Sequence, residues 1–121
     1  MLPAAARLTR REDFSLVLRR GRRAGRTLVV MHVLVPDAPA SSNSPRVGLV
    51  VSKAVGRSVV RHRVSRRLRH VMRDRLAELP AGTQVVVRAL PKAAAAESAQ
   101  LAADVDRALR TLIPSAASSR S

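Results

Sequence analysis

The chain has 121 residues, a size that fits one domain with a single modest core. Its net charge is +15, from 23 Lys and Arg against eight Asp and Glu, which indicates a negatively charged partner, either nucleic acid or an anionic membrane. The hydrophobic share of 46% excludes wholesale disorder despite this charge. Of the basic residues 21 are Arg, whose planar fork suits phosphate, although a genome-wide base bias would give the same ratio.

Three absences narrow the class of protein further. Without cysteine, disulfides and thiolate chemistry are excluded. The longest strongly apolar run, residues 28–35, is far shorter than the roughly 20 residues of a membrane-spanning helix. The charges of residues 1–11 follow the apolar part, whereas a secretory signal carries them before it. We therefore expect a soluble, cytoplasmic protein that does not contact membranes.

The first predicted element is a short helix followed by a basic connector. Thr9 and Glu12 have the spacing of a capping box, which predicts a helix from there to about Arg20. Gly21 suits the left-handed position past a helix end. Residues 21–26 then read as a connector, and residues 7–26 together carry eight Arg against two acids.

Three strands are predicted. Residues 27–35 are rich in β-branched side chains and indicate a buried strand. After a turn-forming loop over residues 36–45, residues 46–52 predict a second strand, paired with the first as a hairpin. Residues 83–90 predict a further strand.

Two more helices complete the pattern, a central one over residues 58–77 and a last one that Ser98 caps and Pro114 ends. The last helix has an apolar stripe made of Leu101, Val105, Ala108, Leu109 and Leu112. The fold class is therefore α+β, a two-layer α–β sandwich in the order α-β-β(-β)-α-β-α. Residues 1–113 form one domain, and we expect residues 114–121 to be a disordered tail.

The rest of the chain is organised around residues 52–75, which hold nine of the 23 basic residues and one acid. Apolar residues recur there at helical spacing: Val60, Val64, Leu68, Val71, Met72 and Leu79. The opposite face of the same helix carries His62, Arg63, Arg66, Arg69, His70 and Arg73. The stretch is thus a folded, amphipathic, basic helix.

The start of this helix favours a bound phosphate. Arg57 and Arg61 lie at or just before its first turn, where the helix dipole disfavours basic side chains. The free backbone N–H groups there already form an anion site. Because Phe14 is the only aromatic residue, base-stacking platforms are absent, and recognition is expected to use phosphates, ribose and shape.

Catalysis by the protein alone is not expected. The eight acids are scattered, without a pair suited to acid–base work. His62 and His70 are about 12 Å apart along one helix and cannot share a metal. His32 is interpreted as a hydrogen-bonded sheet residue. We predict no catalytic residue and no metal bound by the protein.

Several segments closely resemble the signature of the bacterial ribonuclease P protein subunit. Residues 46–56 read RVGLVVSKAVG, and VVRHRV and RRLR follow at residues 59–64 and 66–69. The family signature is a strand of the RVGL-VSKK type, a Gly-Asn turn and a helix opening with Arg-Asn-Arg. Towards the N-terminus, Arg7-Leu8, Asp13-Phe14 and Gly21 match the family's RL…DF…G pattern. The resemblance covers residues 7–112.

This resemblance implies an enzyme in which a catalytic RNA subunit, with bound Mg²⁺, hydrolyses precursor tRNA and releases the 5′ leader. The implied partners are that RNA and the leader, with no obligate protein partner, and the protein supplies no catalytic group. The fold it implies has an unusual left-handed βαβ crossover, similar to the second domain of a small-subunit ribosomal protein. The alternatives are a ribosomal-protein-like binder of structured RNA and, less favoured because acid clusters are missing, an autonomous nuclease.

The RNA-binding residues predicted from the basic helix and the resemblance are Lys53, Arg57, Arg61, His62, Arg63, Arg66, Arg67, Arg69 and Arg73. The resemblance assigns Phe14 and Leu18 to the wall of a leader cleft, with Met31 on the facing strand. Several positions depart from the family; in the helix signature His62 replaces the middle Asn of Arg-Asn-Arg, and Arg57 replaces the Asn after Gly.

Overall fold

The computed structural model describes residues 6–36 and 44–113, so the predicted tail at residues 114–121 lies outside the described residues. The elements follow in the order α1 (Arg11–Arg20), β1 (Arg22–Gly25), β2 (Val29–Leu34), β3 (Arg46–Val50), α2 (Ser58–Arg73), η2 (Leu76–Glu78), β4 (Gln84–Ala89), η3 (Pro91–Ala95) and α3 (Ser98–Leu112). The predicted α+β class and element order are confirmed.

The sheet has the strand order β1-β2-β4-β3, in which β2 is antiparallel to both neighbours and β3 is parallel to β4. The predicted hairpin of β2 with β3 is therefore wrong, because β4 lies between them. β4 takes this inner place because Val85, Val86 and Val87 are fully buried and need cover on both faces of the sheet.

β1 was predicted as a connector and is an edge strand. It pairs with β2 from Arg22 opposite Val33 to Gly25 opposite Val30. Two arginines and a glycine have low strand propensity, so the strand exists through its hydrogen bonds to β2. Charged residues are common on such edges because they block further strand pairing.

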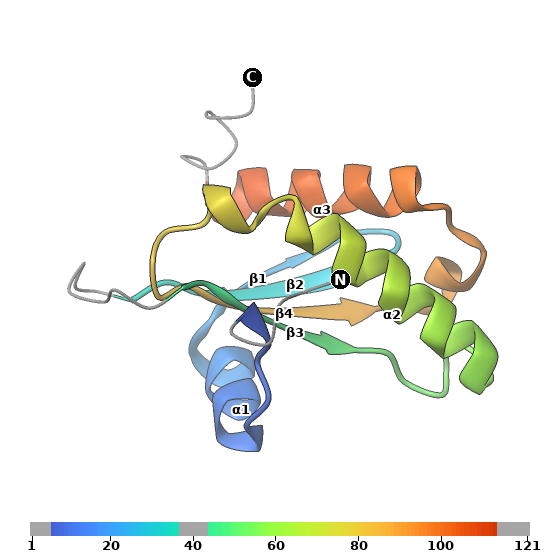
Figure 1. Ribbon diagram of the computed structural model, residues 1–121, viewed down its shortest axis with the longest axis horizontal. Helices are drawn as coiled ribbons and strands as arrows, with labels where there is room; N and C mark the ends of the chain where they lie inside the picture. The colour runs from blue at the N-terminus through green and yellow to red at the C-terminus, as the bar shows by residue number, and fades with distance from the viewer. Residues whose placement is uncertain (1–5, 37–43, 114–121) are drawn as a thin grey trace.

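The helices lie on two sides of the sheet. Figure 1 shows α2 and α3 together on one side and α1 on the other. The main core fills the α2–α3 side and includes Met31, Leu68, Met72, Leu101 and Val105. A smaller cluster of Leu8, Val17 and Val86 lies beneath α1. β3, α2 and β4 form a crossover between neighbouring parallel strands, and its left-handed sense stays a prediction from the family.

The ends of α1 differ from the predicted ones. The N-cap is Arg10 and makes no side-chain hydrogen bond, so Thr9 lies one residue too early to form the predicted capping box. Gly21 is extended, with φ −71°, instead of left-handed. A glycine is needed at this position because a β-carbon there would lie 2.4 Å from the carbonyl oxygen of Val17.

The boundaries of the other helices also differ from the predicted ones. α2 ends at Arg73 instead of residue 77, and the chain continues as η2. The N-cap of α3 is Glu97, one residue before the predicted Ser98, and its side chain forms a reciprocal capping box with Gln100. The predicted apolar stripe of α3 is buried throughout.

Two carboxylates of α3 hold that helix to the rest of the fold. Asp104 Oδ2 accepts hydrogen bonds from the backbone N–H groups of Leu28, at 2.7 Å, and Val29, at 3.3 Å. Asp106 accepts two bonds from the buried guanidinium of Arg75, 2.8 and 3.0 Å long, just past the end of α2. α3 is therefore tied both to the β1–β2 turn and to α2, which fixes α2 on the sheet.

Truncating the buried face of α2 should destabilise the fold, whereas truncating its exposed face should not. Leu68 is fully buried, so Leu68→Ala should lower the free energy of unfolding by about 2 to 5 kcal/mol. Arg66→Ala, on the exposed side of the same helix, is the matched control and should change it by less than about 0.5 kcal/mol. Urea denaturation measures both; equal losses would mean that the two faces are misassigned.

Candidate nucleic-acid interface

A tight turn positions the first basic residues before α2. The N–H groups of Val55 and Gly56 donate to the carbonyls of Ser52 and Lys53, and Val55 is buried beneath them. Gly56 has a positive φ of 155°, which side-chain-bearing residues rarely adopt. The turn consequently leaves the side chains of Lys53 and Arg57 exposed beside the helix start.

α2 begins without the usual capping. Its N-cap is Arg57, which makes no side-chain hydrogen bond, and its first turn contains no acid. The amino end of α2 thus combines uncapped backbone donors with Arg57 and Arg61, as predicted from the sequence. This arrangement is unfavourable for the free protein and favourable for one that holds an anion.

One row of basic side chains on α2 faces η3 and is partly structural. Arg63 Nη2 donates to the carbonyl oxygen of Ala94 at 3.0 Å. One helical turn later, Arg67 Nη1 donates to the carbonyl oxygen of Ala96. Both guanidinium groups therefore brace η3 against α2 and have fewer donors for RNA than the sequence suggests.

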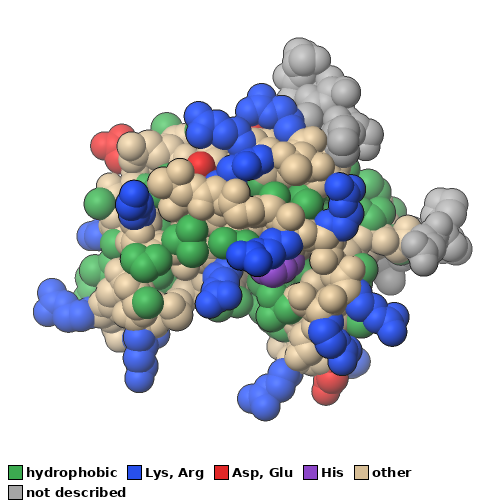
Figure 2. All heavy atoms as spheres, turned by 180° about the vertical axis from the view of Figure 1, so that it is seen from behind, with side chains coloured by type: hydrophobic (Ala, Val, Ile, Leu, Met, Phe, Trp, Pro, Cys, Tyr) green, Lys and Arg blue, Asp and Glu red, His purple; other side chains and the backbone are tan. Residues whose placement is uncertain are grey.

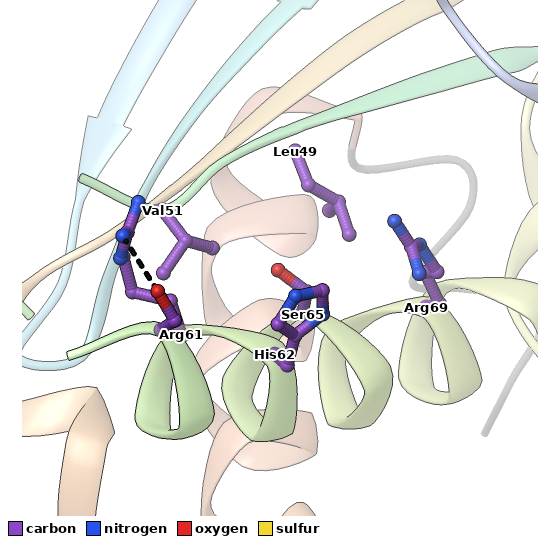
Figure 3. Close-up of a pocket in the computed structure, with 7 residues that line it drawn as sticks. Leu49, Val51, Arg61, His62, Ser65 and Arg69 are labelled. Carbon is purple, nitrogen blue, oxygen red and sulfur yellow. Dashed lines mark hydrogen bonds between the residues drawn. The ribbon is translucent and has the colours of Figure 1, made fainter. Parts of the chain in front are cut away.

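A second row faces β3 and lines a pocket of about 280 Å³. The helix contributes Ser58, Arg61, His62, Ser65 and Arg69, while Leu49 and Val51 come from the strand side. Figure 3 shows Arg61 and Arg69 extending from α2 towards the strand at the two ends of this pocket, with His62 and Ser65 between them.

The remaining basic residues of α2 and of the segment after it differ in exposure and in their ion-pair partners. Arg66 is exposed on the ridge of the helix. Arg73 is also exposed but lies 3.7 Å from Asp74, measured from Nε to Oδ1. Arg75, at the end of the basic stretch, is buried against Asp106 and is a core residue. The exposed surface of α2 is therefore centred on Arg66 and the pocket row.

The three residues assigned to the leader cleft do not lie on one side of the sheet. The ring of Phe14 packs on Gly48, where a β-carbon would lie 2.4 Å from its Cζ. Leu18, on the same helix, is 44% exposed. Met31 is 0% exposed and belongs to the main core on the opposite side of the sheet. Successive residues of a strand point to opposite faces, so Met31 cannot line a cleft with Phe14.

The strand residues on the α1 side include His32, which was not among the residues assigned to the cleft. It sits opposite Arg23 of β1 and Val86 of β4. Arg88 lies on the same face of the sheet, two residues after Val86 in β4. Its Nδ1 is buried and has no hydrogen-bond partner among the described residues, so the predicted hydrogen-bonded sheet histidine is wrong. The alternation of side chains between the two faces of a strand is the sequence signal that could have placed His32 on this side.

Burial and two arginines shape the protonation of His32. Desolvation lowers its pKa from the usual 6.5, and the positive charges of Arg23 and Arg88 lower it further. The ring is consequently neutral at neutral pH when no anion is present. A phosphate near the two arginines would offset their charge and would be a hydrogen-bond partner for this ring.

Basic side chains also dominate the wider surface. Figure 2 shows Lys and Arg distributed across the face opposite to the view of Figure 1, on which Asp and Glu are few. Within residues 6–36 and 44–113, no three His, Cys, Asp or Glu side chains are grouped so that they could hold a metal ion. In the same part of the chain, no helix is long and apolar enough to cross a bilayer.

Comparisons with known proteins agree on one family. Residues 2–113 match the sequence model described as Ribonuclease P. The chain is 59% identical to the ribonuclease P protein component of Streptomyces avermitilis over 118 residues, covering 93% of this chain and 96% of that one. It is 50% identical to that of Corynebacterium diphtheriae over 115 residues, with coverage of 93% and 97%.

Solved structures show the same fold at lower identity. The RNase P protein of Staphylococcus aureus aligns with a TM-score of 0.75 at 20% identity, over 88% of this chain and 94% of that one. The protein from Thermotoga maritima aligns with a TM-score of 0.68 at 23% identity, with the same coverage.

Acid should destabilise the protein through His32. Because the folded state resists protonating this ring and the unfolded state does not, the free energy of unfolding should fall as the pH drops below about 6.5. His32→Gln should remove that part of the dependence. Denaturant titrations from about pH 5.5 to 7.5, in buffers without phosphate or sulfate, measure the difference between the two proteins. A difference that does not vary with pH, or a wild-type protein that gains stability on acidification, would contradict this assignment.

Proposed function

Because the chain belongs to the ribonuclease P protein family, we propose that it is the protein subunit of a ribonuclease P that removes the 5′ leader from precursor tRNA. In this proposal the RNA subunit carries out the hydrolysis in the cytoplasm. The protein holds that RNA through α2 and holds the single-stranded leader through the face that carries α1.

The observation that carries the proposal is the exposed basic face of α2. Its buried stripe and the hydrogen bonds between Arg75 and Asp106 fix the helix on the sheet, so the backbone positions from which its arginines extend are set before RNA binds. Arg66 is exposed on the ridge of this helix, and the pocket row lies beside it, facing β3. Phosphate contacts of this kind give strong, salt-dependent affinity with little sequence preference.

The α1 side supports the leader-binding part. Leu18 is exposed beside Phe14, and His32 lies further across the same side with Arg23 and Arg88. These residues offer apolar contact for bases and cations for phosphates, as a single strand requires. Stacking is expected to be weak, since Phe14 is the only aromatic ring and it is packed on Gly48.

The described acids support a protein that leaves the chemistry to the RNA. Asp104 and Asp106 accept hydrogen bonds from other parts of the fold, and Glu97 caps α3. They are not arranged as a Mg²⁺ site, which needs converging oxygen ligands. We accordingly assign the Mg²⁺ of this reaction to the RNA subunit, where it would supply the activated water or stabilise the leaving oxygen.

Cleavage of precursor tRNA by the RNA subunit tests the proposal. At low Mg²⁺, adding this protein should stimulate cleavage, because its cations offset repulsion between the two RNAs. The 5′ leader should be released at the mature end of the tRNA, and the protein alone should cleave nothing. RNA binding without stimulation would instead fit a ribosomal-protein-like binder, and cleavage by the protein alone would indicate an autonomous nuclease.

A further inference from the structure

The pocket between α2 and β3 differs in chemistry from the rest of the basic surface. One wall is polar and comes from the helix: Arg61 and Arg69 with His62 and Ser65 between them, and Ser58 one turn before Arg61. The other is apolar, made by the half-buried side chains of Leu49 and Val51. Figure 3 shows the Ser65 hydroxyl directed into the space between the helix and Leu49.

A phosphate group alone does not account for this lining. Phosphate needs cations and N–H donors, and it gains nothing from aliphatic side chains. A nucleotide needs both, because its base has two apolar faces and a polar edge, while its phosphate is anionic. The volume of about 280 Å³ lies at the small end of ligand sites, a size for one nucleotide unit but not for a duplex.

Arg61 provides an independent indication of an absent ligand. Its Nη2 lies 3.4 Å from the hydroxyl of Ser58, a long contact. Its Nε is buried and has no hydrogen-bond partner in the part of the chain that the structure describes. Buried donors in proteins are nearly always paired, and a small shift of the Arg61 side chain towards an anion in the pocket would pair this one.

We propose that the β3–α2 pocket binds one unstacked nucleotide of the catalytic RNA, with its base against Leu49 and Val51 and its phosphates on Arg61 and Arg69. The inference rests on the proposed function, because the nucleotide belongs to the RNA that α2 contacts. His62 stacks on or hydrogen-bonds to the base, and the hydroxyls of Ser58 and Ser65 read its edge. This pocket would give the protein a preference for an RNA site with an unpaired residue, which phosphate contacts alone do not give.

Filling the pocket without changing its charge separates this role from general RNA binding. Ser65→Leu places a bulky side chain in the pocket and removes no cation. It should displace the base while the phosphates stay on Arg61 and Arg69, so binding to the catalytic RNA should weaken at least tenfold with the slope of log affinity against log salt unchanged. Arg66→Ala, outside the pocket, should instead reduce the magnitude of that slope by about one phosphate contact.

The control for Ser65→Leu is Ala99→Leu, which adds a leucine at an exposed position in the first turn of α3. It should bind RNA as the unmodified protein does. Equal affinity of Ser65→Leu and Ala99→Leu would overturn the pocket proposal, and stimulation of cleavage by the unmodified protein would still support the proposed function. If the unmodified protein neither binds the RNA nor stimulates cleavage, both proposals fail.

A measurement on the unmodified protein avoids any effect of the substitution on folding. The four nucleoside 5′-monophosphates and inorganic phosphate are titrated separately, and backbone amide shifts of His62 and Ser65 are followed by NMR. At least one nucleotide should shift these signals at a lower concentration than phosphate does. Equal response to phosphate and to all four nucleotides would show an anion site only and would overturn the inference.

Discussion

The excess of positive charge on a small domain is the constraint on which this structure depends. The chain has 23 basic residues and eight acidic ones, a net charge of +15. The basic side chains repel one another, and the few carboxylates cannot neutralise them. Two of these carboxylates, Asp104 and Asp106, instead fix α3 to the β1–β2 turn and to Arg75. The fold is therefore held from the α3 side, and α2 presents arginines whose charge only a polyanion can balance.

The two basic surfaces lie on opposite sides of the sheet, one on α2 and one on the side that carries α1. α2 and α3 cover one side of the sheet with a continuous apolar core, so the outer surface of α2 is free to contact a large RNA. α1 covers part of the other side over a much smaller cluster. Arg23 and Arg88 flank His32 on that side of the sheet. In the proposed function this side binds the single-stranded leader while α2 binds the catalytic RNA.

The sequence predicted the features that depend on the spacing of apolar residues along the chain. The buried and exposed faces of α2 followed from a single helical repeat, and the predicted start of the helix at residue 58 agrees with the structure. Strand pairing did not follow, because it depends on which strand needs burial on both faces, and β4 displaced the expected hairpin. β1 was missed since its pairing with β2, not its composition, makes it a strand.

The sequence predicted that α2 carries an exposed basic face, but it did not predict the contacts of its individual side chains. Arg63 and Arg67 looked like RNA ligands, yet carbonyl groups of η3, some 30 residues away in the chain, accept hydrogen bonds from them. Met31 was assigned to the α1 side of the sheet, where His32 lies instead, because a shift of one residue along a strand changes the face. The pocket beside Ser65 depends on the packing of α2 against β3 and leaves no pattern in the sequence.

Tethered cleavage would test most directly that the two faces hold different RNAs. The chain has no cysteine, so Arg66→Cys on α2 and Leu18→Cys on α1 each provide a single exposed attachment point for an iron chelate. In the complex with the catalytic RNA and precursor tRNA, hydroxyl radicals from position 66 should cut the catalytic RNA, and those from position 18 should cut the 5′ leader. Cuts in the same RNA from both positions, or leader cuts from position 66 alone, would contradict this account.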